Sequence, residues 1–180
     1  MSTASSRIKR MVCCAVFAAL TAICSQIAIP LPLVPINLAL FAVHLCGALM
    51  GPVTGMLSMV LYVGLGLVGV PVFSKLMAGP AVLAGPTGGY IIGYILCALI
   101  VGLVAKFWGD SPWKLVVGML AGLAVCYLFG SLWFMFSLQK SLLATLTACV
   151  FPFLPGDAIK IALAVVVAVR LKKVWKLPLF

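Results

Sequence analysis

The sequence predicts an all-α integral membrane protein, a single transmembrane domain over residues 1–180 with six membrane-spanning helices. Hydrophobic residues make up 66% of the chain and charged residues 8%, a balance that a water-soluble domain of this size can neither bury nor expose. Apolar runs long enough to cross about 30 Å of hydrocarbon recur along the chain. Since no polar block is long enough to form a soluble catalytic domain, we expect the protein to act in or at the bilayer.

Six crossings and one shorter piece account for the apolar runs. The N-terminal run is expected to remain as a true span, because it is longer than a signal-peptide core and Ile23 before Cys24 spoils a lipoprotein-type cleavage site. Three prolines, at positions 30, 32 and 35, end this first helix. The expected crossings are residues 11–29, 36–50, 53–70, 89–107, 113–136 and 156–169, with the shorter apolar piece at 142–150.

The basic residues predict the orientation. The net charge of +10 is spread over the chain ends and the loops, so it indicates topology and does not indicate a nucleic-acid partner. With both termini cytoplasmic, Lys75 and Lys140 lie outside and Lys160 lies within a span, which satisfies the positive-inside rule. The other nine basic residues are then cytoplasmic: Arg7, Lys9, Arg10, Lys106, Lys114, Arg170, Lys172, Lys173 and Lys176.

No metal, disulfide or nucleotide site is expected. The seven cysteines show no CxxC spacing and no Cys/His cluster, so we interpret them as small packing residues. The segment GLGLVG at 64–69 matches GxGxxG, but no strand precedes it and no acid follows at about 20 residues, so we interpret it as close packing against another helix. Lys75 lacks the P-loop spacing, so any ATP must be bound by another subunit.

The connection GVPVFSKLMAGPAVLAGPTGGY, residues 69–90, is mostly apolar and contains five glycines and three prolines. An ordinary connector is short and polar, so we expect this one to fold back over the outer mouth as a structured loop. Thr87 would cap the next helix, and Tyr90 would present its ring and hydroxyl at the same place. Gly88 and Gly89 would let backbone N–H groups face a ligand. The alternative is an interfacial hairpin that only seals the bundle.

Small residues recur four apart in the first helix. The segment AVFAALTA, residues 15–22, pairs Ala15 with Ala19 and Ala18 with Ala22. Such pairs form a shallow groove that allows a second helix to approach closely. The groove serves either internal packing or the docking of a partner.

Two polar residues lie in the second crossing. His44 is in its middle, where no carboxylate is available as a relay partner, so we interpret it as a packing histidine with satisfied polar atoms. Asn37 begins the same crossing after the proline-rich segment, where its amide can both donate and accept at the outer mouth. Helix capping or turn formation is the alternative role for Asn37.

Asp157 and Lys160 are the strongest candidates for a functional site. They are three residues apart on the last helix and therefore lie on one helix face. Each would cost on the order of 3 kcal/mol at membrane depth, so we expect the two to pair and to face the bundle interior. An acid in the first turn is also favoured by the helix dipole, but this leaves the cation Lys160 unexplained.

Several motifs together resemble the biotin transporter BioY family over about residues 11–170. In chain order they are IPLPLVPI, the Gly-Pro turn at 51–52, Tyr62 followed by GLGLVGVPVF, GPTGGY and PFLPGDAIK. The resemblance implies an S component of an energy-coupling factor (ABC-type) importer: a six-helix bundle, not an enzyme, in the plasma membrane of a prokaryote. It implies high-affinity capture of biotin outside and uptake into the cytoplasm. The implied partners are a transmembrane coupling subunit and two ATPase subunits, which use the ATP, so that this chain needs no cofactor.

The resemblance also carries roles to individual residues. Asp157 and Lys160 match the family's polar pair in the last helix. Ala15 and Ala19 match the face that contacts the coupling subunit. Many relatives carry a polar stretch where this chain reads INLA, and Asn37 is the polar residue that would take its place. The matching positions of the outer-mouth loop are Thr87, Gly88, Gly89 and Tyr90.

The chemistry of biotin agrees with these roles. Its ureido ring offers two N–H donors and one carbonyl acceptor, its thiophane ring is apolar, and its valerate chain ends in a carboxylate. Asp157 can accept from the ring N–H groups, while Lys160 can donate to the ureido oxygen or to the carboxylate. The residues leave open which of the two Lys160 meets.

Three alternatives remain at this point. An S component for another vitamin would differ only in its ligand. A channel or an ion-coupled carrier would take up its substrate along an ion gradient without ATPase partners. A membrane enzyme such as a lipid transferase would need a constellation of acids, and the only acids, Asp110 and Asp157, lie far apart in the sequence.

Overall fold

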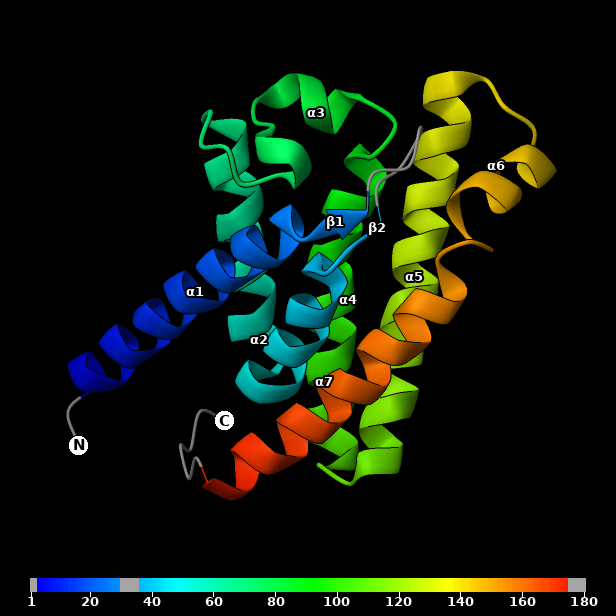
Figure 1. The fold of residues 1–180 in the computed structure, drawn as a ribbon. Coiled ribbons are helices and arrows are strands. Elements are labelled where there is room, and N and C mark those ends of the chain that lie inside the picture. The colour runs from blue at the N-terminus through cyan, green and yellow to red at the C-terminus, as the bar shows by residue number, and fades with distance from the viewer. Residues whose placement is uncertain (1–2, 30–35, 175–180) are drawn as a thin grey trace.

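The computed structural model describes residues 3–29 and 36–174, in which helices joined by loops make up most of the chain and one short ladder pairs two strands (Figure 1). The longest elements are helices α1 Thr3–Gln26, α2 Ala39–Leu67, α4 Gly88–Trp108, α5 Pro112–Leu138 and α7 Leu154–Val174. The shorter ones are strands β1 Ala28–Ile29 and β2 Ile36–Asn37, the 3-10 turn η1 Ser74–Leu76, and helices α3 Pro80–Ala84 and α6 Leu142–Cys149.

By length and composition, four helices of the described chain can cross a membrane: Arg7–Gln26, Ala39–Leu67, Gly88–Trp108 and Pro112–Leu138. Helices α6 and α7 meet at a bend of 51° and add a fifth span if the pair is taken as one. Large apolar side chains such as Val16, Leu120 and Leu163 are exposed on the outside of these helices. Lipid accommodates such a surface, whereas water penalises it.

Helix α2 reverses direction in its middle. Gly51 has φ 74° and ψ −176°, a conformation that favours glycine, and Pro52 follows it. Residues nine apart in an unbroken helix are separated by about 13 Å, yet the Cys46 Sγ lies 3.9 Å from the carbonyl oxygen of Gly55. The two halves of α2 therefore lie folded back on each other, as the expected break between residues 36–50 and 53–70 requires.

Several expected helix boundaries are wrong: the first helix begins at Thr3, the third crossing ends at Leu67 and the last helix extends over Leu154–Val174. Two further differences lie on either side of the proline-rich segment. The first helix ends at Gln26 and not at residue 29, and the second begins at Ala39 and not at residue 36. The residues between pair instead as an antiparallel ladder, Ala28 with Asn37 and Ile29 with Ile36. Proline disfavours the helical conformation in the residue before it, which explains why the helix cannot continue to Ile29. The expected stop at Pro30, Pro32 and Pro35 lies outside the described residues.

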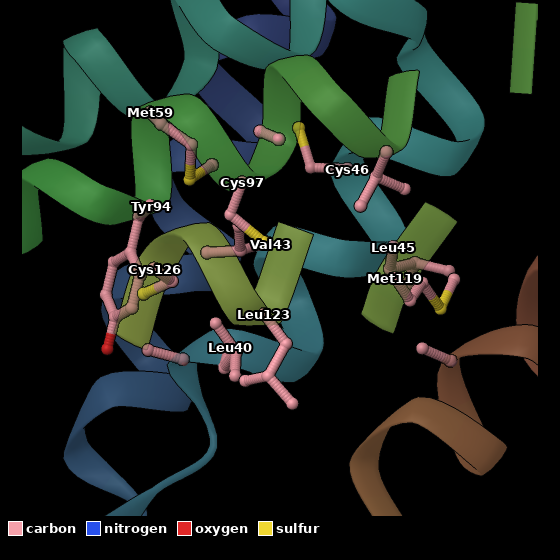
Figure 2. Close-up of a cluster of buried hydrophobic side chains, with 14 of the residues drawn as sticks. Leu40, Val43, Leu45, Cys46, Met59, Tyr94, Cys97, Met119, Leu123 and Cys126 are labelled. Atoms are coloured by element: carbon pink, nitrogen blue, oxygen red, sulfur yellow. The ribbon is translucent and has the colours of Figure 1, made fainter. Parts of the chain in front are cut away.

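The core forms where α2, α4 and α5 meet (Figure 2). Small side chains allow the helices to approach closely, and five of the seven cysteines, all of them free thiols, are buried, as the packing interpretation predicts. A Cβ added at Gly102 of α4 would lie 2.5 Å from the carbonyl carbon of Gly51. Helix α4 therefore crosses α2 at its reversal with no room for a side chain.

Replacing Gly102 with alanine is expected to destabilise the bundle, because the methyl group would collide with the backbone at the reversal of α2. Overpacking of this kind costs about 1–3 kcal/mol. The matched control is Gly64→Ala in α2, because a Cβ added at Gly64 meets nothing within 4 Å and alanine favours the helix. Thermal unfolding in detergent should show a lower midpoint for Gly102→Ala alone. Equal midpoints for the two variants would contradict this account of the crossing.

Candidate substrate-binding site

A cavity lies between helices α2, α4, α5 and α7 and the loop that contains η1 and α3. About 740 Å³ of space lies between its walls, a figure that includes open solvent at the mouth. Its lining residues are Asn37, Leu40, Tyr62, Phe73, Ser74, Met77, Val82, Thr87, Tyr90, Ile91, Tyr94, Cys126, Tyr127, Phe153, Asp157 and Lys160.

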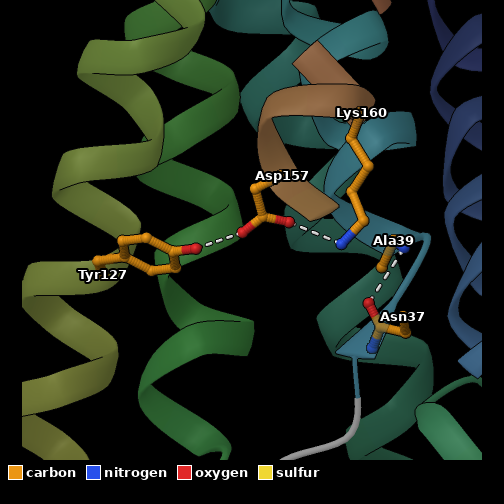
Figure 3. A network of polar contacts seen from close by, with 5 residues as sticks. All are labelled: Asn37, Ala39, Tyr127, Asp157 and Lys160. Atoms are coloured by element: carbon orange, nitrogen blue, oxygen red, sulfur yellow. Dashed lines mark hydrogen bonds and ion pairs between the residues drawn. The ribbon is translucent and has the colours of Figure 1, made fainter. Parts of the chain in front are cut away.

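One wall of the cavity carries an ion pair. The Lys160 Nζ lies 2.6 Å from the Asp157 Oδ1, and the two residues are 6% and 2% exposed. The hydroxyl of Tyr127, from α5, donates to the other carboxylate oxygen of Asp157 (Figure 3). Pairing and this second contact offset the cost of burying the charges. The expectation that Asp157 and Lys160 pair and face the bundle interior is confirmed for this geometry.

All four tyrosines of the chain line this cavity. The hydroxyl of Tyr62 donates to the carbonyl of Val72 over 3.2 Å, and that of Tyr90 lies 3.4 Å from the Ser131 hydroxyl. Tyrosine combines an apolar ring with a polar tip. The walls are therefore aromatic, with hydroxyl groups at fixed places. Sequence reasoning missed Tyr62, Tyr94 and Tyr127 as lining residues, because only the packing of α2, α4 and α5 brings these side chains together.

Asn37 lies at the junction of β2 and α2 and has two structural partners. Its Oδ1 accepts from the backbone N–H of Ala39 over 3.1 Å, and its Nδ2 donates to the Ser74 hydroxyl over 2.6 Å. Both Asn37 and Ser74 line the cavity. The side chain thus forms the turn that begins α2 and also joins that turn to the loop between α2 and α4.

The loop between α2 and α4 is fastened to the C-terminal end of α1. The Ser25 hydroxyl donates to the carbonyl of Val72 over 2.6 Å, and the Gln26 amide donates to the carbonyl of Phe73 over 3.0 Å. In return, the backbone N–H of Leu76 donates to the Gln26 Oε1 over 3.0 Å. The loop is therefore held by two neighbouring side chains at one helix end.

Phe73 is the apolar anchor of this loop. Its ring meets Tyr62 edge to face, with centroids 5.7 Å apart. A Cβ added at Gly66 would lie 2.0 Å from the ring. The GLGLVG segment therefore provides space for an aromatic ring of the loop, and no strand precedes it in α2. The packing interpretation holds, although the partner is a loop residue and not a second helix.

The GPTGG stretch contributes differently from expectation. Thr87 occupies the N-cap position of α4, but its side chain makes no capping hydrogen bond. The N–H of Gly88 donates to the carbonyl of Gly85 over 3.1 Å. A Cβ added at Gly89 would lie 2.3 Å from the Cβ of Trp133. Thr87 and Tyr90 line the cavity, whereas Gly88 and Gly89 are among the tightly packed residues behind it.

The two small-residue pairs of α1 face different ways. Ala18 is buried and Ala22 is half-buried, so this pair packs inside the bundle. Ala15 and Ala19 are both exposed. The internal packing and the open face are thus separate features of one helix.

His44 is completely buried, as a packing residue should be, but the expectation that its polar atoms are satisfied is wrong. Its Nδ1 lies 3.6 Å from the Cys97 Sγ. Its Nε2 has no hydrogen-bond partner among the described residues. No group of three or more His, Cys, Asp or Glu residues that could hold a metal ion occurs in the described part of the chain.

Relatives of this chain are known from sequence. A biotin transporter BioY of Thermotoga maritima is 38% identical over 165 residues, which cover 92% of this chain and 96% of the relative. A probable biotin transporter BioY of Pyrococcus horikoshii is 37% identical over 160 residues, or 88% of this chain and 93% of the relative.

A solved structure and a family model agree with these relatives. The crystal structure of an S-component for biotin from an ECF-type ABC transporter superposes with a TM-score of 0.88 at 29% identity, and the match covers 96% of this chain and 95% of that one. The model of the BioY family matches residues 1–177. This chain therefore belongs to the BioY family.

Proposed function

We propose that this protein captures biotin at the outer face of a cell membrane and is the S component of an energy-coupling factor importer. The observation that carries the proposal is the cavity wall formed by Asp157, Lys160 and Tyr127. A carboxylate and an ammonium side by side present an acceptor and a donor to a ureido ring. The aromatic walls suit the apolar thiophane ring.

Binding without chemical change follows from the same wall. Tyr127 contacts one carboxylate oxygen of Asp157 and Lys160 contacts the other. Asp157 is therefore suited to hold a ligand in place and not to act as a general base. Biotin is favoured over another vitamin because the relatives and the matching structure carry biotin in their names. The substrate-binding residues that we propose are Asp157, Lys160, Tyr90, Thr87 and Asn37, with Gly88 and Gly89 supporting the loop from behind.

Purified protein in detergent should bind biotin saturably, and Asp157→Asn should weaken this binding by about 100-fold or more, because hydrogen bonds to a charged group are worth about 1.5–3 kcal/mol each. Titration calorimetry measures both. The matched control is Asp110→Asn, which changes the chain's other carboxylate, exposed and paired with Lys172 away from the cavity. This control should bind as the wild type does. Absence of saturable biotin binding by the wild type would overturn the substrate assignment.

We further propose that the exposed Ala15 and Ala19 of α1 dock a transmembrane coupling subunit, to which two ATPase subunits supply the energy. Small exposed side chains let a second helix approach closely within lipid. Both residues lie outside the cavity lining. Capture and docking would therefore be separate functions of the bundle.

Ala15→Trp and Ala19→Trp should each spare biotin binding and abolish biotin uptake, because the indole ring fills the groove that a partner helix needs. Uptake of labelled biotin is measured in cells that contain the complete transporter, and binding is measured on the purified subunit. Leu120→Trp, on an exposed face of α5, is the control and should retain both. Retained uptake in the two alanine variants would remove the docking role.

Six crossings with both termini cytoplasmic are the topology that we propose. The reversal at Gly51 supports two crossings within α2. The loop between α2 and α4 and the connection between α4 and α5 lie at opposite ends of the bundle (Figure 1).

If both termini are cytoplasmic, fluorescent-protein fusions at each end of the chain should be active, and a periplasmic-type phosphatase fused at the same places should be inactive. An active phosphatase at either end would reject this topology.

A further inference from the structure

The charges inside the cavity already compensate each other. The chain has two side-chain carboxylates, and each is ion-paired with a lysine of α7: Asp157 with Lys160, and Asp110 with Lys172. Lys160 is also the only basic residue that lines the cavity in the described part of the chain. A ligand that brings a carboxylate of its own therefore finds no uncompensated cation at this wall, and an unpaired buried carboxylate is strongly unfavourable.

A second cation, Lys75, lies in the loop that lines the cavity. Lys75 is exposed, while its neighbours Phe73, Ser74 and Met77 line the cavity. Both carboxylates of the chain are paired with other lysines, so within the described residues Lys75 is an outer-loop ammonium without an acidic partner. Lys75 therefore presents an exposed positive charge next to residues that line the cavity.

The backbone around Lys75 is fixed in an unusual conformation. Lys75 has φ 63° and Leu76 has φ 56°. These values lie in the left-handed region of backbone conformation, which residues other than glycine rarely adopt. The N–H of Leu76 donates to the Gln26 Oε1, and the N–H of Phe73 donates to the carbonyl of Met77 over 3.1 Å. Such a conformation persists where the surroundings determine it and is often found at ligand sites.

We propose that Lys75 is a specificity-determining residue that receives the carboxylate of the ligand at the rim. This inference rests on the proposed function, since it takes biotin as the ligand. The ring system lies against the buried wall of Asp157 and Lys160, and the valerate chain points to the mouth. In this orientation Lys160 donates to the ureido oxygen. The ammonium of Lys75 then pairs with the valerate carboxylate near solvent.

The test compares biotin with biotinamide, which has the same ring system and a neutral tail. The wild type should bind biotin up to about five-fold more tightly, the upper end of the range for a solvent-exposed ion pair. Lys75→Gln should reduce this ratio to about one by weakening biotin alone, and Lys75→Arg should restore it. Lys140→Gln is the matched control, because Lys140 is exposed between α5 and α6 and lines no part of the cavity. The wild-type preference should also decline as salt rises toward about 1 M, where screening is nearly complete.

The possible outcomes separate the two proposals. An unchanged ratio in Lys75→Gln would overturn the rim site. Equal weakening of both ligands would also overturn it, because Lys75 would then act on the loop and not on the carboxylate. Failure of the wild type to bind either ligand would overturn the proposed function itself, and the rim site with it.

Discussion

The buried pair of Asp157 and Lys160 constrains the arrangement of the whole bundle. Either charge facing lipid would cost about 3 kcal/mol, so α7 can present this face only to the interior. There Tyr127 of α5 completes the contacts of the carboxylate. The interior of the bundle therefore contains a polar wall. The cavity lies beside this wall. The cavity is thus a consequence of where two charges can be tolerated.

Much of this arrangement could be predicted from the sequence, because its signals are strong and local. Apolar runs identify the helices whatever their neighbours are. The scarcity of acids makes Asp157 conspicuous, and its spacing from Lys160 is enough to place both on a common helix face. The glycine and proline at 51–52 likewise mark the reversal of α2. Each of these features depends on a few consecutive residues.

The remaining features depend on contacts between distant segments. Tyr127 is 30 residues from Asp157 in the sequence, and nothing in its own helix indicates which partner its hydroxyl meets. The ladder of β1 and β2 replaces helix at both ends of the proline-rich segment, and its register depends on which residues of the two separate segments meet. Gly88 and Gly89 were expected to face a ligand, but whether a glycine serves a ligand or a neighbouring helix is decided by what lies opposite. For Gly89 that is Trp133.

The fastening of the outer loop has a kinetic consequence. Hydrogen bonds of Ser25, Gln26 and Asn37 hold the loop over the cavity, and each contributes about 0.5–1.5 kcal/mol net. A loop that must break several of them together is open for only on the order of 1% of the time or less. A ligand that leaves past this loop can depart only when the loop opens. The rate of release then depends on the hydrogen bonds of the loop, which do not touch the ligand. The residence time of a captured molecule is then a property of the end of α1 as much as of the cavity.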